Sequence, residues 1–379
     1  MVYRMIFNQE AYFGRGAIKQ IPDVAKAHGF TKAFIVTDPV LIETGTVKKV
    51  TDVLDEAGMP YEVFSNVQPN PPVECIKDGV AKFADAGADF LIGLGGGSPQ
   101  DTCKGIGIVA ANPEFADVLS LEGVAATKNP SAPIFGVPTT AGTASETTIN
   151  YVITDTANKR KFVAVDPHDI PIVAFVDPDL TDTQPRSLKV ATGLDALTHA
   201  IEGYITPGAW SLSDCLSMQT IRMIAKNLAK SAEGDIPAGE QMAYASYITG
   251  MAYSNVGLGL VHGMAHPLGG RLGVAHGGAN GILLAWNTTR TTPARSTVTS
   301  PTRSAFRTPT PAISTMCVTR RLRRCATSPR SSATRPPSPR SAPPRPTWRD
   351  WPMTRSTTCA RRATRVRPPR RTSTRSTSR

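Results

Sequence analysis

The chain of 379 residues has few cysteines and no long apolar run. Its 6 cysteines form no CxxC pair, and the three that precede residue 286 (Cys75, Cys103 and Cys215) cannot all be paired with one another. Such usage is typical of a reducing compartment. The N-terminus lacks the apolar run of a signal peptide, and no stretch approaches the roughly 18 apolar residues of a membrane span. We therefore expect a cytoplasmic protein without membrane contact.

Lysine and glycine are absent from residues 286–379, which contain 22 arginines and one acidic residue, Asp350. This segment carries +21, so the overall charge of +12 leaves −9 for the residues before it. The body of the protein is therefore acidic, which argues against a nucleic-acid-binding function. Binding to nucleic acid is expected only as a non-specific, salt-sensitive property of the basic segment.

Residues 286–379 also lack hydrophobic periodicity, because Thr, Arg, Ser and Pro dominate them. Low hydrophobicity combined with high charge leaves too little apolar surface to offset the conformational entropy of the chain. The composition predicts a disordered tail.

The first half alternates short apolar runs with helical patterns. Such alternation predicts right-handed βαβ units and a mostly parallel sheet. We expect a Rossmann-like α/β domain over residues 1–184. Its strands are predicted at 33–37, 61–64, 89–94, 134–137 and 170–176, and its helices at 46–57 and 73–86.

From about Pro185 the helical period of apolar residues dominates, and no strand-like alternation is visible. Helices are predicted at 188–204, 212–229 and 238–256. We expect a second, all-helical domain over residues 185–285.

Acidic and imidazole side chains recur at helical spacing in this second region. Asp195 and His199 are four residues apart, as are His262 and His266, so each pair shares one helix face. His276 follows, which places three histidines within fifteen residues. A carboxylate with several imidazoles suits a borderline divalent ion such as Fe²⁺ or Zn²⁺. The alternative is a set of separate, hydrogen-bonded histidines, which this clustering disfavours.

Two loops rich in glycine and threonine follow predicted strands, the GGGS stretch at 95–98 and PTTAGT at 138–143. Glycines at a strand-to-helix turn let the backbone approach a phosphate, and the helix N-terminus attracts anions. Asp38, just past another strand, could accept hydrogen bonds from a ribose and would repel a 2′-phosphate, which favours NAD over NADP. The alternatives are a tight turn for the glycines and a simple helix cap for Asp38.

These residues lie within longer stretches that resemble the iron-dependent (group III) alcohol dehydrogenases. The stretches include GGGSPQDTCKGIGI, PTTAGTASETTINYVITD, RKFVAVDPHDIP, ATGLDALTHAIEGYIT and SNVGLGLVHGMAHPLG. The resemblance is dense from Arg4 to Leu284 and is strongest to the subgroup that acts on lactaldehyde and propane-1,2-diol. It implies a dehydroquinate synthase-like architecture, with the active site in a cleft between a Rossmann-like and a helical domain.

The resemblance also implies a role for individual residues. The implied metal ligands are Asp195, His199, His262 and His276. His266 and Asn150 would face the substrate and serve catalysis. The implied cofactor contacts are Asp38, Asn70, Gly96, Gly97, Ser98, Thr139, Thr140, Thr143 and Lys161.

The implied activity is iron-dependent, NAD-linked reduction of lactaldehyde to propane-1,2-diol and the reverse oxidation. A broader short-chain alcohol or 1,3-propanediol dehydrogenase of the same family is the alternative. The subgroup is dimeric partly through its N-terminal strand, which residues 5–13 match, so a homodimer is expected.

The resemblance ends at Leu284, where the family continues with helices that complete the second domain. With suitable codons, a one-base shift of the reading frame turns residues 286–298 into a polar, periodic sequence similar to that continuation. We therefore expect an incomplete helical domain followed by an out-of-frame tail. The rival hypotheses are a genuine basic tail that binds nucleic acid and an inactive product with a structural metal site.

Overall fold

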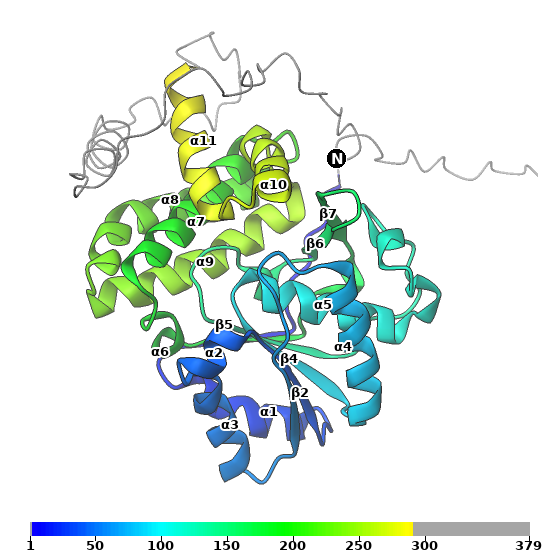
Figure 1. Cartoon of the computed structure of the whole chain (residues 1–379). Coiled ribbons are helices and arrows are strands. Elements are labelled where there is room, and N and C mark those ends of the chain that lie inside the picture. Colours follow the sequence, from blue (N-terminus) through cyan, green and yellow to red (C-terminus); the bar gives the residue numbers. More distant parts are fainter. Residues whose placement is uncertain (1, 291–379) are drawn as a thin grey trace, which may run out of the picture. The chain divides into compact units, whose positions relative to one another are not determined.

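Six parallel strands form the central sheet of the N-terminal half (Figure 1). The computed structural model describes residues 2–290, without the side chains of 288–290. The strand order is β1-β8-β5-β4-β2-β3. The strands are β1 (Glu10–Phe13), β2 (Ala33–Val36), β3 (Tyr61–Phe64), β4 (Phe90–Gly95), β5 (Ile134–Pro138) and β8 (Val173–Val176).

Helices cover both faces of this sheet, which explains why its strands are apolar at nearly every position. The flanking helices are α1 (Ile21–Ala27), α2 (Pro39–Glu43), α3 (Thr46–Glu56), α4 (Val73–Ala86) and α5 (Gly97–Ala111). Alternate residues of one strand enter opposite cores: Ile35 packs in the core that contains α1 and α3, whereas Phe34 packs in the core that contains α4 and α5. Short 3-10 turns lie at Ala17–Gln20, Pro113–Phe115, Val118–Leu121, Ser145–Thr147 and Pro167–Asp169.

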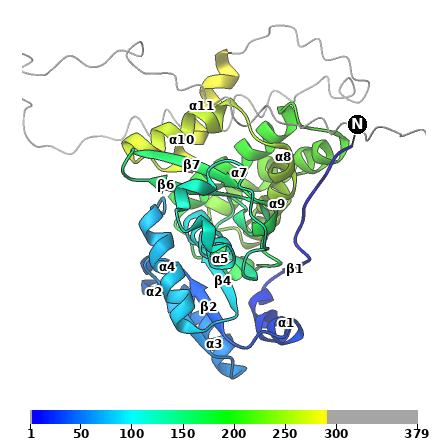
Figure 2. The same ribbon diagram turned by 90° about the vertical axis from the view of Figure 1, so that its right-hand side faces the viewer.

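The second half is helical, as predicted (Figure 2). After the short α6 (Pro178–Thr181), the helices are α7 (Arg186–Ile205), α8 (Ser211–Ala232), α9 (Ile236–Val256), α10 (Leu260–Leu272) and α11 (His276–Arg290). α11 continues past residue 285, so no break in secondary structure occurs at the expected boundary.

An antiparallel hairpin, β6 (Asn150–Asp155) and β7 (Arg160–Val165), was not predicted from the sequence. Burial alternates along β6, because Tyr151 and Ile153 are buried while their neighbours are partly exposed. The sequence itself does not alternate there, since Val152 between them is also apolar. α5 packs against β6 and α10 packs against β7, so this hairpin lies between α5 and α10 (Figure 2).

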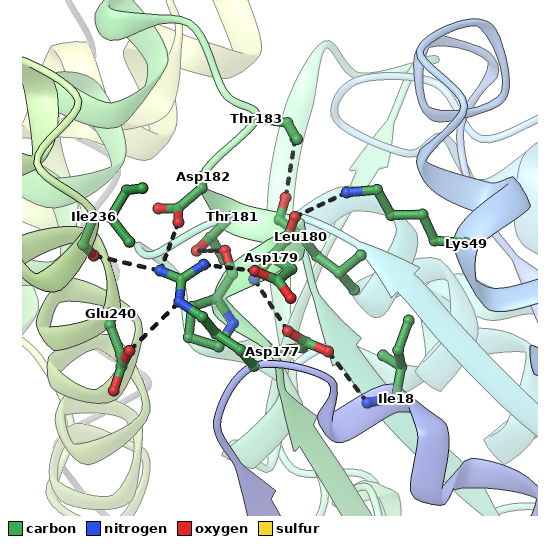
Figure 3. Close-up of polar contacts among 12 residues, drawn as sticks. Ile18, Lys49, Asp177, Asp179, Leu180, Thr181, Asp182, Thr183, Ile236 and Glu240 are labelled. Atoms are coloured by element: carbon green, nitrogen blue, oxygen red, sulfur yellow. Dashed lines mark hydrogen bonds and ion pairs between the residues drawn. The ribbon is translucent and has the colours of Figure 1, made fainter.

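Arg15 joins three separate segments by ion pairs. Its guanidinium lies 2.5 Å from Asp179 and 2.7 Å from Asp182, both near α6, and 3.6 Å from Glu240 of α9. Figure 3 shows these carboxylates and the Ile236 carbonyl converging on one guanidinium. The ion pairs of Arg15 therefore connect the loop after β1 with the helical half.

Residues 2–290 belong to one compact unit, and the proposed division at residue 184 stays a prediction. None of the helices in this described part is both long and apolar enough to cross a membrane. The predicted disordered tail lies outside the described residues, apart from its first residues in α11.

Candidate metal and cofactor site

Helix α7 carries the first two proposed ligands on one face. Asp195 and His199 are buried, with exposed fractions of 2% and 4%. The His199 Nδ1 atom lies 3.9 Å from Asp195 Oδ1 and has no hydrogen-bond partner. A buried imidazole nitrogen without a partner is rare unless a ligand or ion completes it.

α10 and α11 bring two more histidines to the same point. Asp195, His262 and His276 each offer a ligand atom, and these atoms lie within 4.8 Å of one another. The Asn280 amide nitrogen lies among them, 2.6 Å from Asp195 Oδ1, 3.0 Å from His262 Nε2 and 3.2 Å from His276 Nε2. Three ligand atoms thus converge on one position that a single electropositive group can fill.

The protonation states suit metal binding, which requires an ionised carboxylate and neutral imidazoles. Burial would raise the pKa of Asp195, but the nearby His199, His276 and His262 and the Asn280 amide bring it below its usual value. Burial lowers the pKa of His199 well below 6.5 and also lowers the pKa of His276. The donor set therefore fits a divalent iron or zinc ion.

His266 lies beside this cluster without belonging to it. Its ring centroid is 5.2 Å from that of His276 and 6.3 Å from that of His262. Burial, followed by the charges of His276 and His262, lowers its pKa to about 3, so its imidazole is neutral near pH 7.

Besides Asn280, two buried residues near the cluster were not predicted from the sequence. Glu202 lies 2.6 Å from His262 Nδ1, and its spacing of three residues after His199 was the available signal. Tyr253 stacks on the His199 ring at 4.3 Å and donates a hydrogen bond to the Thr143 carbonyl at 2.6 Å. No sequence signal pointed to Tyr253, because its contacts join segments that are far apart in the chain.

The two predicted glycine and threonine loops are adjacent, as expected for the carboxyl ends of neighbouring parallel strands. The Thr139 N–H donates to the Gly95 carbonyl at 3.0 Å. A Cβ atom at Gly96 would lie 3.0 Å from Thr140, and one at Gly97 would lie 3.1 Å from Thr143. A side chain at either glycine would crowd these threonines where β4 turns into α5. No side chain caps the N-terminus of this 15-residue helix, so its first N–H groups suit an anion.

Asn70, Ser98 and Lys161 form a connected group. The Asn70 backbone has a φ of 57°, and its N–H donates to Ser98 Oγ at 3.2 Å. Lys161 Nζ donates to Asn70 Oδ1 at 2.6 Å. Burial lowers the pKa of Lys161, while Asp101 and Asp195 partly offset this. Lys161 therefore lies between the loops and the Asp/His cluster.

Asp38 and Asn150 form hydrogen bonds with residues outside this group. Asp38 Oδ1 accepts the Leu41 N–H at 3.0 Å, so it caps α2. Asn150 begins β6, and its carbonyl accepts a hydrogen bond from Lys104 at 3.0 Å.

Comparison with known proteins extends these observations. The profile of iron-containing alcohol dehydrogenases matches residues 8–178, and the C-terminal profile of the same family matches residues 189–300. This chain belongs to the iron-containing alcohol dehydrogenase family. The chain is 58% identical to a lactaldehyde reductase of Escherichia coli over 284 residues, 75% of this chain and 74% of that protein.

Other family members show the range of related proteins. A 1,3-propanediol dehydrogenase of Klebsiella pneumoniae is 43% identical over 291 residues, 75% of each chain. The crystal structure of a 1,3-propanediol oxidoreductase superposes with a TM-score of 0.73 at 41% identity over 76% of each chain. A sulfoacetaldehyde reductase from Bifidobacterium kashiwanohense in complex with NAD⁺ superposes with a TM-score of 0.69 at 29% identity, over 76% of this chain and 77% of that one. These comparisons confirm the predicted family and fold.

Proposed function

We propose that this dehydrogenase catalyses the NAD-linked interconversion of lactaldehyde and propane-1,2-diol with a divalent iron ion. The convergence of Asp195, His262 and His276 within 4.8 Å carries the proposal. The 58% identity to a lactaldehyde reductase supports the choice of substrate. His199 would be the fourth ligand, and the same donor set could hold Zn²⁺.

The bound metal supplies Lewis acidity toward the carbonyl oxygen, and NADH supplies the hydride. The chain would contribute the negative charge of Asp195 and the imidazole nitrogens of the proposed histidine ligands. A proton would reach the reduced oxygen through His266, at the edge of the cluster, or through a ribose hydroxyl and water. Asn150 would orient the substrate from the start of β6.

The cofactor would lie across the two adjacent loops. Gly96 and Gly97 let a pyrophosphate approach the N-terminus of α5, and Asp38 would accept a hydrogen bond from the ribose. Lys161 and Asn70 would bind the part of the cofactor nearest to the metal. The remaining contacts in this proposal are Ser98, Thr139, Thr140 and Thr143.

Discrimination among small substrates should be modest, because one methyl group in a pocket contributes only about 1–3 kcal/mol. The 43% identity to a 1,3-propanediol dehydrogenase makes propane-1,3-diol the competing substrate. Comparison of kcat/KM for propane-1,2-diol and propane-1,3-diol would distinguish the two substrates.

The test uses the full chain loaded with Fe²⁺ or Zn²⁺. We expect NAD reduction with propane-1,2-diol, and we expect His262→Ala to abolish both metal retention and turnover because it removes one proposed ligand. His168→Ala is the matched control, since its imidazole side chain is 41% exposed. Full metal content and turnover in the His262 variant would refute the assignment.

We also propose that two copies of the chain form a homodimer through the N-terminal strand. β1 lies at the end of the strand order and pairs only with β8 among the described strands, so its outer edge is available. A monomeric mass in sedimentation analysis would contradict this.

A further inference from the structure

Glu202 lies on the same face of α7 as two proposed ligands. It follows Asp195 by seven residues and His199 by three, which is close to whole turns of a helix. Its exposed fraction is only 2%. A buried carboxylate must be paired, because an unpaired charge in the interior is strongly destabilising.

Its hydrogen-bond partners lie at the N-terminus of α10. Glu202 Oε1 accepts the Val261 N–H at 2.6 Å. Glu202 Oε2 accepts the His262 N–H at 3.3 Å and lies 2.6 Å from His262 Nδ1. α10 has no side-chain cap of its own, so a carboxylate from another helix satisfies its first N–H groups.

The contact with Nδ1 determines how the imidazole is protonated. An ionised carboxylate can only accept hydrogen bonds, so His262 Nδ1 must carry the proton. In a neutral imidazole the other nitrogen, Nε2, then presents its lone pair. Nε2 is the atom that faces the cluster, 3.9 Å from Asp195 Oδ1.

We infer that Glu202 is a positioning residue that makes His262 Nε2 the metal-binding atom and fixes the direction of the ring. This inference rests on the metal site proposed above. One stripe of α7 then supplies two ligands and also the carboxylate that orients a third, from α10. A hydrogen-bond partner of this kind typically raises metal affinity by about 10–100-fold.

A substitution at Gly259 would disturb the contact between Glu202 and His262 in a second way. A Cβ atom at this position would lie 2.7 Å from Glu202 Oε1, so a larger residue would displace the carboxylate without removing it. Gly263, one turn later in α10, has no atom within 4 Å of its Cβ position and is the matched control.

The experiment measures Zn²⁺ affinity of the full chain by competition with a chromophoric chelator. We expect Glu202→Gln to weaken binding by about 10–100-fold, and Gly259→Ala to weaken it by a smaller factor. Gly263→Ala and Glu146→Gln should bind Zn²⁺ as wild type does. Glu146 is also 2% exposed, but among the described residues no hydrogen bond or ion pair joins its side chain to a proposed metal ligand.

Two further measurements separate positioning from a purely structural role. Nitrogen-15 NMR of labelled histidine in chelator-treated protein should show His262 protonated at Nδ1 in wild type and a shifted tautomer ratio in Glu202→Gln. Circular dichroism should show a helical content close to wild type. An unchanged Zn²⁺ affinity or an unchanged His262 tautomer in Glu202→Gln would overturn the inference about Glu202 but would leave the proposed metal site standing. Failure of the wild-type chain to bind zinc would overturn the proposed metal site and, with it, this inference.

Discussion

At the scale of single residues, Asp38 illustrates a side chain for which two roles are possible. It caps α2 through Leu41, and it is also proposed to select NAD by repelling a 2′-phosphate. Asp38→Asn separates the roles, because asparagine caps helices as well as aspartate does but carries no charge. We expect both Asp38→Asn and Asp38→Gly to raise kcat/KM for NADP relative to NAD. A change in the Gly variant alone would assign Asp38 to the cap.

Glu146 is a buried carboxyl whose pKa is raised from 4.5 to about 7, chiefly by burial, with Lys104 acting in the opposite direction. Its folded-state pKa exceeds the unfolded value, so the stability that its protonated form provides is fully present below about pH 4.5. That stability is lost as the pH rises through about 7.

Glu146→Gln keeps the shape and removes the titration. We expect it to raise the free energy of unfolding at about pH 8 by up to about 3 kcal/mol, with a much smaller effect at about pH 5. Chemical denaturation at both pH values is the measurement. An equal effect at both would show that Glu146 does not titrate in this range.

At the scale of elements, the contact between α7 and α11 places His276 beside Asp195. Gly277 makes it possible, because a methyl group at this position would overlap the Ala191 carbonyl of α7. Gly278, its neighbour, has no atom within 4 Å of its Cβ position. The two glycines differ in surroundings although they are adjacent in the same helix.

Gly277→Ala should therefore push α11 away from α7. We expect a loss of about 1–3 kcal/mol in the free energy of unfolding, as for overpacked positions, together with weaker Zn²⁺ binding. Gly278→Ala should leave both unchanged or slightly increase stability, because alanine favours a helix. Equal behaviour of the two variants would contradict the close-contact explanation.

At the scale of the whole molecule, the last described helices leave large apolar side chains in solvent. Leu260, Leu272 and Ile282 are 66%, 64% and 59% exposed. Burying such a side chain contributes about 1.5–3 kcal/mol, and net stability is only about 5–15 kcal/mol. The chain covers 74% of the E. coli lactaldehyde reductase, so that protein has further sequence with which such a face could be covered.

We therefore predict that the 379-residue chain is aggregation-prone and weakly active beside a version whose reading frame is restored after Leu284. Soluble yield, metal content and propane-1,2-diol oxidation would be compared for the two. Equal values for the two versions would show that the arginine-rich segment impairs neither folding nor activity. They would also show that the exposed Leu260, Leu272 and Ile282 do not need to be buried by further helices.

The sequence by itself determined the α/β half, the helical half and the family. Continuous apolar strands, helical periodicity and the spacing of Asp195 and His199 are local features that a linear reading can detect. Tyr61–Phe64 and Val73–Ala86 were predicted with their observed bounds. Only the tertiary structure decided how His262 and His276 approach Asp195, and that Glu202, Asn280 and Tyr253 join them. Those contacts connect different helices, and their distances depend on how the helices pack, which no spacing along the chain encodes.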